Sequence, residues 1–557
     1  MTQNYVEYME RSIRDNWYLP AFTDYRAESK SYGDVAEAIY RLHALMREAG
    51  IAKGDKVSVL GRNSTNWAIT YLAVTTYGAA IVPILPDFHP MDIENIVTHS
   101  DSRLFFAAPS FLEKLNPDKM PGLDAAFSLA DFSLYRAREG FPAAEAVARA
   151  NGRFEADYRP NLNPSAFSLC RPDGDDLQSI VYTSGTTGFS KGVMLTHTNI
   201  ISNLVYAQDN VKLKGGDTIL SFLPLAHCFG QAFEFIFPFS RGCHITFLGK
   251  IPATKVLIDA FAEVKPRMVL SVPLVIEKIY YKQIKPMLSK GAIGFIAKVP
   301  LLRLAIQRVI RGKILGFFGG EVQNIIIGGA SFNPEVEKFL TKIRIPFTVG
   351  YGMTECAPLI GYSDWRERTK ASAGRLVDRM ELKIDGNPEL GEFCVRGANV
   401  TKGYYKNPEE TARTIDADGW FHTGDLGYLD GSGFIHIKGR SKTMILGASG
   451  QNIYPEEIEA KLNNLPLVAE SLVLEDGGML TALVFPDLAE TKTRGLDDKA
   501  LSDLMEQNRV ELNKQLPEYG RVASIVIQNE EFQKTPTNKV KRFLYAKKRN
   551  PAEKAAK

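Results

Sequence analysis

The sequence predicts an α/β protein, with a large N-terminal part that ends in a β-rich region and a small α+β C-terminal domain. Short apolar runs alternate with segments of helical periodicity through the first 440 residues; they include "KVSVLG", "SIVYTS", "HITFLG", "RMVLSVP" and "NIIIGG". This alternation is typical of βα units with largely parallel sheets. At 557 residues the chain is also too long for one ordinary domain, so two or more are expected.

The first elements follow this pattern. The stretch "DVAEAIYRLHALMREAG", residues 34–50, has helical spacing and ends on Gly50, a residue typical of helix C-caps. An uncharged run over residues 63–86 is long enough to span a bilayer, but it contains several Thr, two Asn, a Gly and two Pro. A helix packed on a sheet, followed by the buried strand "GAAIVPI", explains this run better.

The C-terminal part has a different pattern. From Asn387 onward, short strands and turns such as "GEFCVRG" and "GWFHTGDLGYLDGSGFIHIKGR" indicate a small antiparallel region. After Arg440 the chain alternates helix "PEEIEAKLNNLP", strands "AESLVLED" and "LTALVFPD", and helix "DKALSDLMEQNRVELNKQL". We therefore expect two domains, 1–440 and 441–557.

Composition excludes several classes. Hydrophobic content of 45% and charged content of 24% are globular averages, which argues against disordered and fibrous proteins. The formal net charge of +3 gives no reason to expect nucleic-acid binding. Five scattered cysteines without metal-ligand spacing fit a reducing compartment and argue against disulfides or a structural zinc site. The charged N-terminus does not look like a secretory signal, so a cytoplasmic location is expected.

The stretch "YTSGTTGFSKGV", residues 182–193, combines glycines, hydroxyl side chains and Lys191 directly after the apolar run "LQSIVY". Glycines let a backbone approach phosphate oxygens, hydroxyls donate hydrogen bonds and lysine adds a positive charge. The spacing is not that of a Walker A loop, because Gly185 is followed five residues later by Ser190 and not by Gly-Lys. By itself such a loop is as often a linker as a phosphate site.

The stretch is accompanied by seven further blocks: "LPLAHCFG", "GGASFNPEV", "GYGMTE", "GWFHTGDLG", "IKGRSKTMI", "SGQNIYPEEIE" and "KTPTNKVKR". In this order they resemble the motifs of the AMP-forming adenylating enzymes, the superfamily of acyl-CoA synthetases, luciferases and peptide-synthetase adenylation domains. The resemblance runs from about residue 31 to residue 542 and is closest to long-chain fatty acyl-CoA synthetases.

The resemblance implies a reaction in two steps. A carboxylate attacks the α-phosphate of ATP to give an acyl-adenylate and pyrophosphate, and the thiol of CoA then displaces AMP. Two anions must meet in the first step, so cations and oriented donors, with Mg²⁺ beside the ATP, have to cancel their repulsion. Residues 1–440 would form the adenylation domain that binds acid, ATP and Mg²⁺. Residues 441–557 would form a mobile lid.

The resemblance also assigns roles to individual residues. Catalysis falls to Lys539, Glu355 and His227, and the metal to Glu355 and Thr183. ATP and AMP binding falls to Thr183, Ser184, Gly185, Thr186, Thr187, Gly188, Lys191, Gly328, Gly329, Ala330, Tyr351, Gly352, Thr354, Asp425 and Arg440. Lys442 matches the hinge of the lid, and Gly450 is expected to contact CoA. The family usually has Gly before the catalytic lysine, whereas this chain has Asn538, the next-best residue at positive φ.

Most of these residues also have an ordinary structural interpretation. A Glu after a glycine-rich turn is often a helix-start charge, and an Asp beside Gly is common in turns. Lone histidines in apolar runs, like His227, are more often satisfied core groups. Cys228 beside it could suggest a Cys/His nucleophile pair, but sequence neighbours need not face each other and the implied chemistry needs no enzymic thiol.

Two segments bear on the acid. Five phenylalanines alternate in "FGQAFEFIFPFSRG" (Phe229, Phe233, Phe235, Phe237 and Phe239), which allows a strand, a helix lining an acyl tunnel as the resemblance implies, or plain core packing. The basic, apolar stretch 285–320 resembles an insertion of long-chain synthetases. It could lie on an anionic membrane surface or form helices packed on the large domain.

The expected partners are therefore a fatty acid or other carboxylic acid, ATP and CoA. Peripheral association with the inner membrane face stays open, as do the chain length of the acid and the oligomeric state. Two alternatives remain: acyl transfer to an acyl carrier protein, and a catalytically silent fatty-acid- or nucleotide-binding protein on the same scaffold.

Overall fold

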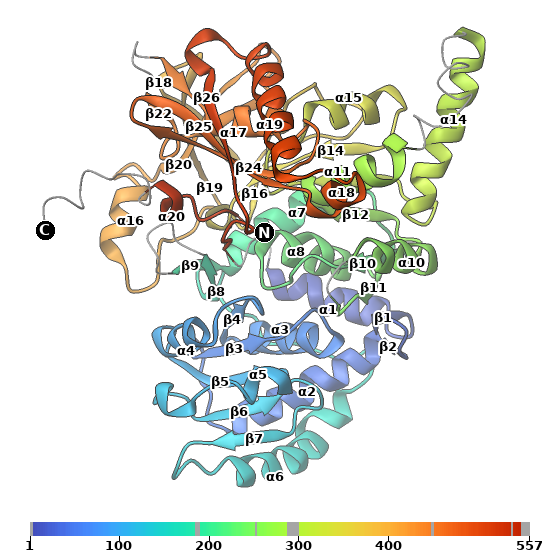
Figure 1. The fold of residues 1–557 in the computed structure, drawn as a ribbon. Helices are drawn as coiled ribbons and strands as arrows, with labels where there is room; N and C mark the ends of the chain where they lie inside the picture. Colours follow the sequence, from blue (N-terminus) through green and yellow to red (C-terminus); the bar gives the residue numbers. More distant parts are fainter. Residues whose placement is uncertain are drawn as a thin grey trace, which may run out of the picture. The chain divides into compact units, whose positions relative to one another are not determined.

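The computed structural model describes residues 4–183, 190–250, 253–286, 300–446, 451–535 and 539–546 (Figure 1). Two compact units divide the chain. The first takes residues up to 183, 190–382 and 395–421, and the second takes 383–394 and the residues from 422 onward. The predicted fold class, α/β layers with a β-rich region and a C-terminal α+β part, is confirmed.

The first unit contains two seven-stranded sheets. One has the order β7-β6-β5-β3-β4-β8-β9, and it is parallel except for β7 and β9 at its edges. Its strands are β3 (Lys56–Leu60), β4 (Ala80–Ile84), β5 (Ser102–Ala107), β6 (Ala125–Ser128), β7 (Leu134–Ala137), β8 (Leu177–Thr183) and β9 (Lys191–Thr196). Its neighbouring helices include α2 (Tyr32–Glu48), α3 (Thr65–Tyr77), α4 (Pro90–His99) and α6 (Ala143–Arg153).

The uncharged run over residues 63–86 forms α3 and β4, as predicted. Trp67 of α3 is fully buried, and β4 is buried along its whole length. Gly78 ends α3 in the left-handed conformation, a common C-cap geometry. The predicted cap of α2 differs by one position: Ala49 is the C-cap, and Gly50 takes the positive φ after it. Among the described residues, no helix has both the length and the hydropathy to cross a bilayer.

The other sheet of the first unit has the order β14-β13-β12-β10-β11-β1-β2, and its pairings are parallel apart from β2. Its strands are β1 (Pro20–Asp24), β2 (Ser29–Ser31), β10 (Thr218–Ser221), β11 (His244–Phe247), β12 (Met268–Ser271), β13 (Asn324–Ile327) and β14 (Phe347–Val349). The helices of this region include α1 (Tyr5–Asp15), α7 (His197–Asn210), α10 (Thr254–Val264), α11 (Pro273–Ile279), α14 (Pro300–Phe317) and α15 (Pro334–Lys342).

The phenylalanine run is helical. Short turns α8 (Cys228–Gly230) and α9 (Phe237–Ser240) flank a π-helical segment, η4 (Gln231–Ile236). Phe235 is fully buried against Trp67, Tyr71 and Phe22. For this ring, core packing is therefore the correct interpretation.

Helix α14 belongs to the basic stretch 285–320, of which residues 287–299 lie outside the described residues. It buries Ile310 and Ile314, one helical turn apart, and the following Phe318 packs edge-on against Phe261 of α10 at 5.3 Å between ring centroids. Arg308 and Lys313 of the same helix are exposed. The described part of this stretch is thus a helix packed on the first unit by its apolar face.

A small sheet of the first unit carries part of the candidate site: β15 (Tyr351–Gly352), β16 (Leu359–Tyr362) and β17 (Arg375–Leu376). A four-stranded sheet has the order β18-β19-β20-β21, built from β18 (Met380–Asn387), β19 (Leu390–Gly397), β20 (Phe421–Leu429) and β21 (Ile435–Arg440).

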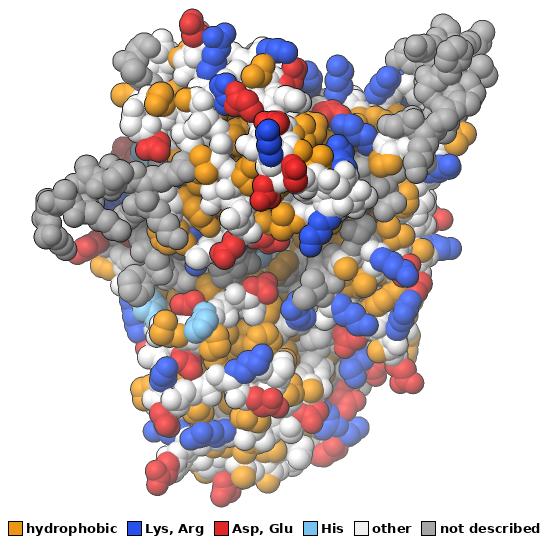
Figure 2. All heavy atoms as spheres, viewed as in Figure 1, with side chains coloured by type: hydrophobic (Ala, Val, Ile, Leu, Met, Phe, Trp, Pro, Cys, Tyr) orange, Lys and Arg blue, Asp and Glu red, His pale blue; other side chains and the backbone are white. Residues whose placement is uncertain are grey.

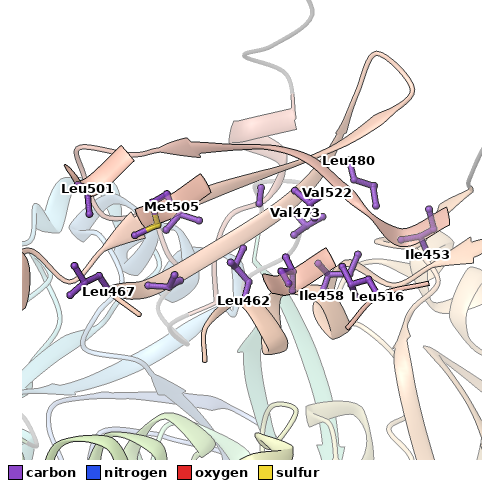
Figure 3. Close-up of a cluster of buried hydrophobic side chains, with 14 residues drawn as sticks. Ile453, Ile458, Leu462, Leu467, Val473, Leu480, Leu501, Met505, Leu516 and Val522 are labelled. Carbon is purple, nitrogen blue, oxygen red and sulfur yellow. The ribbon is translucent and has the colours of Figure 1, made fainter. Parts of the chain in front are cut away.

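The α+β part of the second unit joins helices α17 (Pro455–Leu462) and α19 (Asp498–Asn513) to a sheet of β24 (Val468–Asp476), β25 (Met479–Pro486) and β26 (Val522–Ile527). Leu462, Val473 and Met505 are among the side chains that fill its core (Figure 3). On the face drawn in Figure 2, basic and acidic side chains are interspersed, in keeping with the small net charge.

Candidate active site

Two neighbouring parallel strands of the first unit end at the same place. Ile327 of β13 pairs with Val349 of β14, and the backbone N–H of Gly350 donates to the Ile327 carbonyl at 2.9 Å. The segments that follow, residues 328–330 and 351–355, therefore leave the sheet side by side. Ligands of α/β proteins bind at such carboxyl ends.

The segment after β13 exposes its backbone. Gly328 is buried, and a Cβ added to it would lie 3.1 Å from the Phe229 ring. Gly329 has a φ of +89°, in the left-handed region that favours glycine, and both Gly329 and Ala330 are exposed. This geometry is compatible with the expected packing of their backbone against adenine, which stays a prediction.

The segment after β14 is a tight turn. A Cβ on Gly352 would come within 2.3 Å of the Pro358 carbonyl oxygen, so only glycine fits there. Tyr351 and Thr354 are buried, whereas the side chain of Glu355 is partly exposed. The Glu355 carbonyl accepts from the Thr401 N–H at 2.7 Å, which fixes the turn against the segment that carries Tyr404.

Tyr404 links two of the predicted site residues. Its hydroxyl donates to Glu355 Oε1 at 2.9 Å, and Lys191 Nζ lies 5.4 Å from the centroid of its ring. Burial, followed by the Glu355 charge, raises the pKa of the Tyr404 hydroxyl, so it stays protonated and donates. Lys191 pairs with Thr183 across the β8–β9 ladder, which places the ends of the glycine-rich loop together.

Lys191 is also engaged by Glu410 of α16 (Pro408–Thr414), with which it forms an ion pair. The hydrogen bond from Lys191 is the main reason why the pKa of Glu410 is lowered. Tyr404 and Glu410 were missed by sequence reasoning. Each lies in "KGYYKNPEE", which reads as a turn before a helix and contains no hint of partners 49 and 219 residues away.

His227 caps a helical turn that meets the Glu355 segment. Its Nδ1 accepts from the Phe229 N–H at 3.3 Å, and its side chain is partly exposed. The adjacent Cys228 is buried near Thr354 and Glu355; burial and then the Glu355 charge raise the pKa of the thiol to about 12. A thiol with this pKa is neutral at pH 7, which agrees with discounting a Cys/His nucleophile pair.

Two buried side chains accept hydrogen bonds from the backbone of the segment before His227. Glu234 Oε2 accepts from the N–H groups of Phe222 and Leu223, both at 3.0 Å, and Asn63 Oδ1 accepts from the Leu225 N–H at 3.0 Å. Complete burial raises the pKa of Glu234 well above its usual range. Neither residue could be found from sequence, because a buried Glu in an apolar helix has no motif.

In the second unit the structure brings Asp425 and Arg440 together. They are cross-strand partners of β20 and β21, and Arg440 Nε donates to Asp425 Oδ1 at 2.9 Å. Lys442 is exposed in the turn that follows β21. Lys539 is exposed in a loop where its N–H donates to Thr535 Oγ1 at 3.1 Å.

Several predicted residues lie outside the described part of the chain. These are Ser184, Gly185, Thr186, Thr187 and Gly188 of the glycine-rich loop, the CoA-site candidate Gly450, and Asn538 before the predicted catalytic lysine.

The chain belongs to the AMP-binding enzyme family, whose profile matches residues 10–405. It is 28% identical over 516 residues to the peroxisomal long chain acyl-CoA synthetase 6 of Arabidopsis thaliana, covering 86% of this chain and 72% of that protein. It is also 28% identical over 565 residues to human long-chain-fatty-acid–CoA ligase 6, covering 92% and 80%.

Solved structures share the fold. The anthranilate CoA ligase AuaEII in complex with anthranoyl-AMP superimposes with a TM-score of 0.78 at 18% identity, covering 99% of this chain and 98% of that chain. This likeness confirms the fold, and the family match confirms the resemblance inferred from the eight sequence blocks.

Proposed function

We propose that this protein is an ATP-dependent, AMP-forming acid–CoA ligase whose preferred acid is a long-chain fatty acid. The observation that carries the proposal is the cluster of Lys191, Tyr404 and Glu355 in a family of AMP-binding enzymes. The Tyr404 hydroxyl donates to the Glu355 carboxylate, and the Lys191 ammonium group lies over the ring of the same tyrosine. This cation and this carboxylate would hold the triphosphate of ATP and its metal ion.

Lys191 would bind the β- and γ-phosphates together with Thr183 and the glycine-rich loop. In the structure the ammonium group is paired with Glu410, so ATP binding requires an exchange of partners. The phosphate oxygens replace one carboxylate with a more highly charged acceptor, which favours the exchange.

Glu355 and Thr183 fit magnesium by donor chemistry, since carboxylate and hydroxyl oxygens are ligands that Mg²⁺ accepts. When bound with ATP, the ion would neutralise phosphate charge. The Tyr404 hydroxyl donates to Glu355 Oε1 and would orient this carboxylate. Thr354 would contact the nucleotide.

Three groups of residues would hold the nucleoside. Gly328, Gly329 and Ala330 would pack on adenine beside Tyr351 and Gly352. Asp425 would accept from the ribose hydroxyls, and Arg440, already hydrogen-bonded to that carboxylate, would keep it ionised and oriented.

Lys539 would bridge the carboxylate of the acid and the α-phosphate, which places a cation where two anions meet. Residues 441–557 would then turn about Lys442 to bring the CoA site, with Gly450, to the adenylate. His227 would line the acyl end of the site.

The preference for a long-chain fatty acid has two lines of support. The relatives in Arabidopsis thaliana and human are long-chain acyl-CoA synthetases. The basic, partly buried helix α14 also lies in the stretch that resembles the insertion of long-chain synthetases. The solved structures include a ligase of an aromatic acid, so an acid panel is the decisive test.

The purified protein would be incubated with ATP, magnesium, CoA and a panel of fatty and aromatic acids, and AMP release would be measured. We expect AMP release to rise with chain length, because each additional buried methylene contributes about 0.8 kcal/mol. Activity confined to benzoates or cinnamates would contradict the fatty-acid assignment. A protein that binds ATP but never exchanges pyrophosphate into ATP in the presence of any acid would contradict the ligase itself.

A further inference from the structure

Four metal-ligating side chains gather on three neighbouring strands of the second unit. Asp385 lies on β18, Glu392 and Cys394 lie on β19, and His422 lies on β20, with β19 between the other two strands. Residues two apart on a strand share a face, so Glu392 and Cys394 point the same way. None of these residues has a role in the proposed reaction.

The donor atoms converge. One ligand atom from each of the four residues lies within 4.8 Å of all the others. Cys394 Sγ is 3.4 Å from His422 Nδ1, and the same nitrogen is 3.4 Å from Glu392 Oε2. Tetrahedral zinc with bonds of about 2.0–2.3 Å places neighbouring ligand atoms about 3.3–3.8 Å apart, so these two separations match the edges of a zinc tetrahedron.

The geometry argues against a Cys–His–Glu nucleophile triad. In such a triad the thiol and the carboxylate use opposite nitrogens of the ring, whereas here both face Nδ1. Cys394 is also fully buried, which keeps a substrate away from its sulfur. Three donors around one point suit an ion better than a proton relay.

The surroundings supply two further features of metal sites. Glu392 Oε1 accepts from the Gly424 N–H at 2.7 Å, so one oxygen is held by the backbone while the other faces His422, the type of outer hydrogen bond that orients a ligand. Asp385 is exposed, which gives an ion a path to the cluster from solvent.

We propose that Asp385, Glu392, Cys394 and His422 bind one Zn²⁺ ion. A thiolate, an imidazole and carboxylates are the ligands that zinc takes, whereas magnesium and calcium prefer oxygen alone. On binding, the Cys394 thiol loses its proton to solvent and its sulfur bonds the ion. The site was invisible to sequence spacing, which argued against structural zinc, because its ligands come from three strands.

The ion would join β18, β19 and β20 at one point. His422 lies three residues before Asp425 on β20, and the Glu392 carboxylate holds the Gly424 N–H directly before Asp425. Zinc would therefore rigidify the strand that carries the proposed ribose-binding carboxylate. It would act as a structural ion and not in the chemistry.

The test uses the full-length protein after removal of metal with a chelator. Co²⁺ is titrated in as a spectroscopic substitute for zinc, and Zn²⁺ binding is measured by calorimetry without nucleotide or acid. We expect one ion per chain, a thiolate-to-cobalt charge-transfer band and the intense visible bands of tetrahedral cobalt, which zinc abolishes.

Variants locate the ion. Cys394→Ser and His422→Asn should remove the charge-transfer band and weaken zinc binding by more than about 100-fold, beyond the 10- to 100-fold typical of an outer-shell loss. Asp385→Asn, a substitution of the same shape at an exposed position, should weaken it by at least about 10-fold. Matched controls are Cys170→Ser, an exposed thiol of the first unit, and His436→Asn on β21, and both should bind zinc normally.

Absence of a stoichiometric ion in the unsubstituted protein would overturn the proposal. Equal zinc affinity in Cys394→Ser, Asp385→Asn and the controls would do the same. All readouts are binding and spectra, so they are independent of whether the ligase proposal holds.

Discussion

At the scale of single residues, Tyr404 connects the proposed phosphate-binding lysine with the proposed metal-binding glutamate. One buried hydroxyl orients the carboxylate, and the face of the same ring lies beside the ammonium group. A hydrogen bond to a charged group contributes about 1.5–3 kcal/mol, more than most single contacts. The residue should therefore matter both for the orientation of Glu355 and for stability.

Tyr404→Phe removes the hydroxyl and keeps the ring. We expect acid-dependent pyrophosphate exchange to fall by about 10- to 100-fold, because Glu355 loses its oriented donor. The melting temperature should fall by only a few degrees, because the same hydrogen bond also contributes to stability. Tyr405→Phe is the matched control, since that neighbouring hydroxyl donates to exposed Asp101, and equal losses in both variants would contradict the role of Tyr404.

Glu410→Gln tests the exchange of partners at Lys191. Removing the carboxylate frees the ammonium group for phosphate, so KM for ATP should fall by about 2- to 5-fold, the range of a partly exposed ion pair. Arg413→Gln, which removes the other, exposed partner of Glu410, serves as the control. A rise in KM in Glu410→Gln would mean that the pair positions Lys191 for ATP and does not compete with it.

At the scale of elements, buried polar side chains take part in the packing of helices against one another. His43 of α2 is fully buried against α3, where its Nε2 contacts the Ala73 carbonyl at 2.9 Å. Burial lowers the pKa of His43 to about 4. The folded chain thus keeps neutral a group that the unfolded chain protonates at a pH near 6.5.

The first unit should accordingly lose stability on acidification. Above pH 6.5 both states hold His43 neutral and nothing is lost; between about 6.5 and 4 only the unfolded state binds the proton, so the free energy of unfolding falls as pH falls. The shift corresponds to about 3 kcal/mol at pH 4. The free energy of unfolding would be measured between pH 4 and 6.5 in the unsubstituted protein and in His43→Gln. It should depend less on pH in the variant. The same pH dependence in both proteins would contradict a lowered pKa of His43.

The turn before His227 depends on Glu234. Because burial raises the pKa of this acid well above its usual range and so favours the neutral form, Glu234→Gln keeps the acceptor and an uncharged side chain and should change stability little. Glu234→Ala leaves the Phe222 and Leu223 N–H groups without this acceptor and should cost about 2–6 kcal/mol. Denaturant unfolding measures both, and a large loss in Glu234→Gln would show that the carboxylate is ionised.

Elements and motifs were predictable where the signal is local. The β8–loop–β9 segment and the turn at Glu355 are contiguous, so their residue types could be read directly. The phenylalanine run was ambiguous because alternation suggests a strand, whereas the backbone is helical over residues 228–240. The contacts of Phe235 with Trp67 and Tyr71 form only in the folded core. Tyr404, Glu410 and Glu234 act through tertiary contacts, which no local pattern contains.

At the scale of the whole molecule, the proposed reaction divides its residues between the two units. Lys191, Glu355 and His227 belong to the first, whereas Asp425, Arg440, Lys442 and Lys539 belong to the second. In the proposed mechanism, residues 441–557 would turn about Lys442 between adenylate formation and thioester formation. The two half-reactions should then respond separately to mutation.

Lys539→Ala should abolish adenylate formation, because no cation bridges the carboxylate and the α-phosphate, and should largely spare thioester formation from supplied acyl-adenylate. Lys442→Pro should instead impair the second step more than the first, by stiffening the hinge. Each half-reaction is assayed alone. Equal loss of both steps in Lys539→Ala would contradict the assignment of this lysine.

The direct pairing of Thr183 with Lys191 across β8 and β9 restricts how this enzyme can be varied. Because side chains alternate along a strand, inserting or deleting one residue within β8 or β9 would turn the following side chains to the opposite face or break the register. Variants should therefore keep the lengths of β8 and β9 constant. Residue types in the connection can change only where the predicted phosphate contacts are kept.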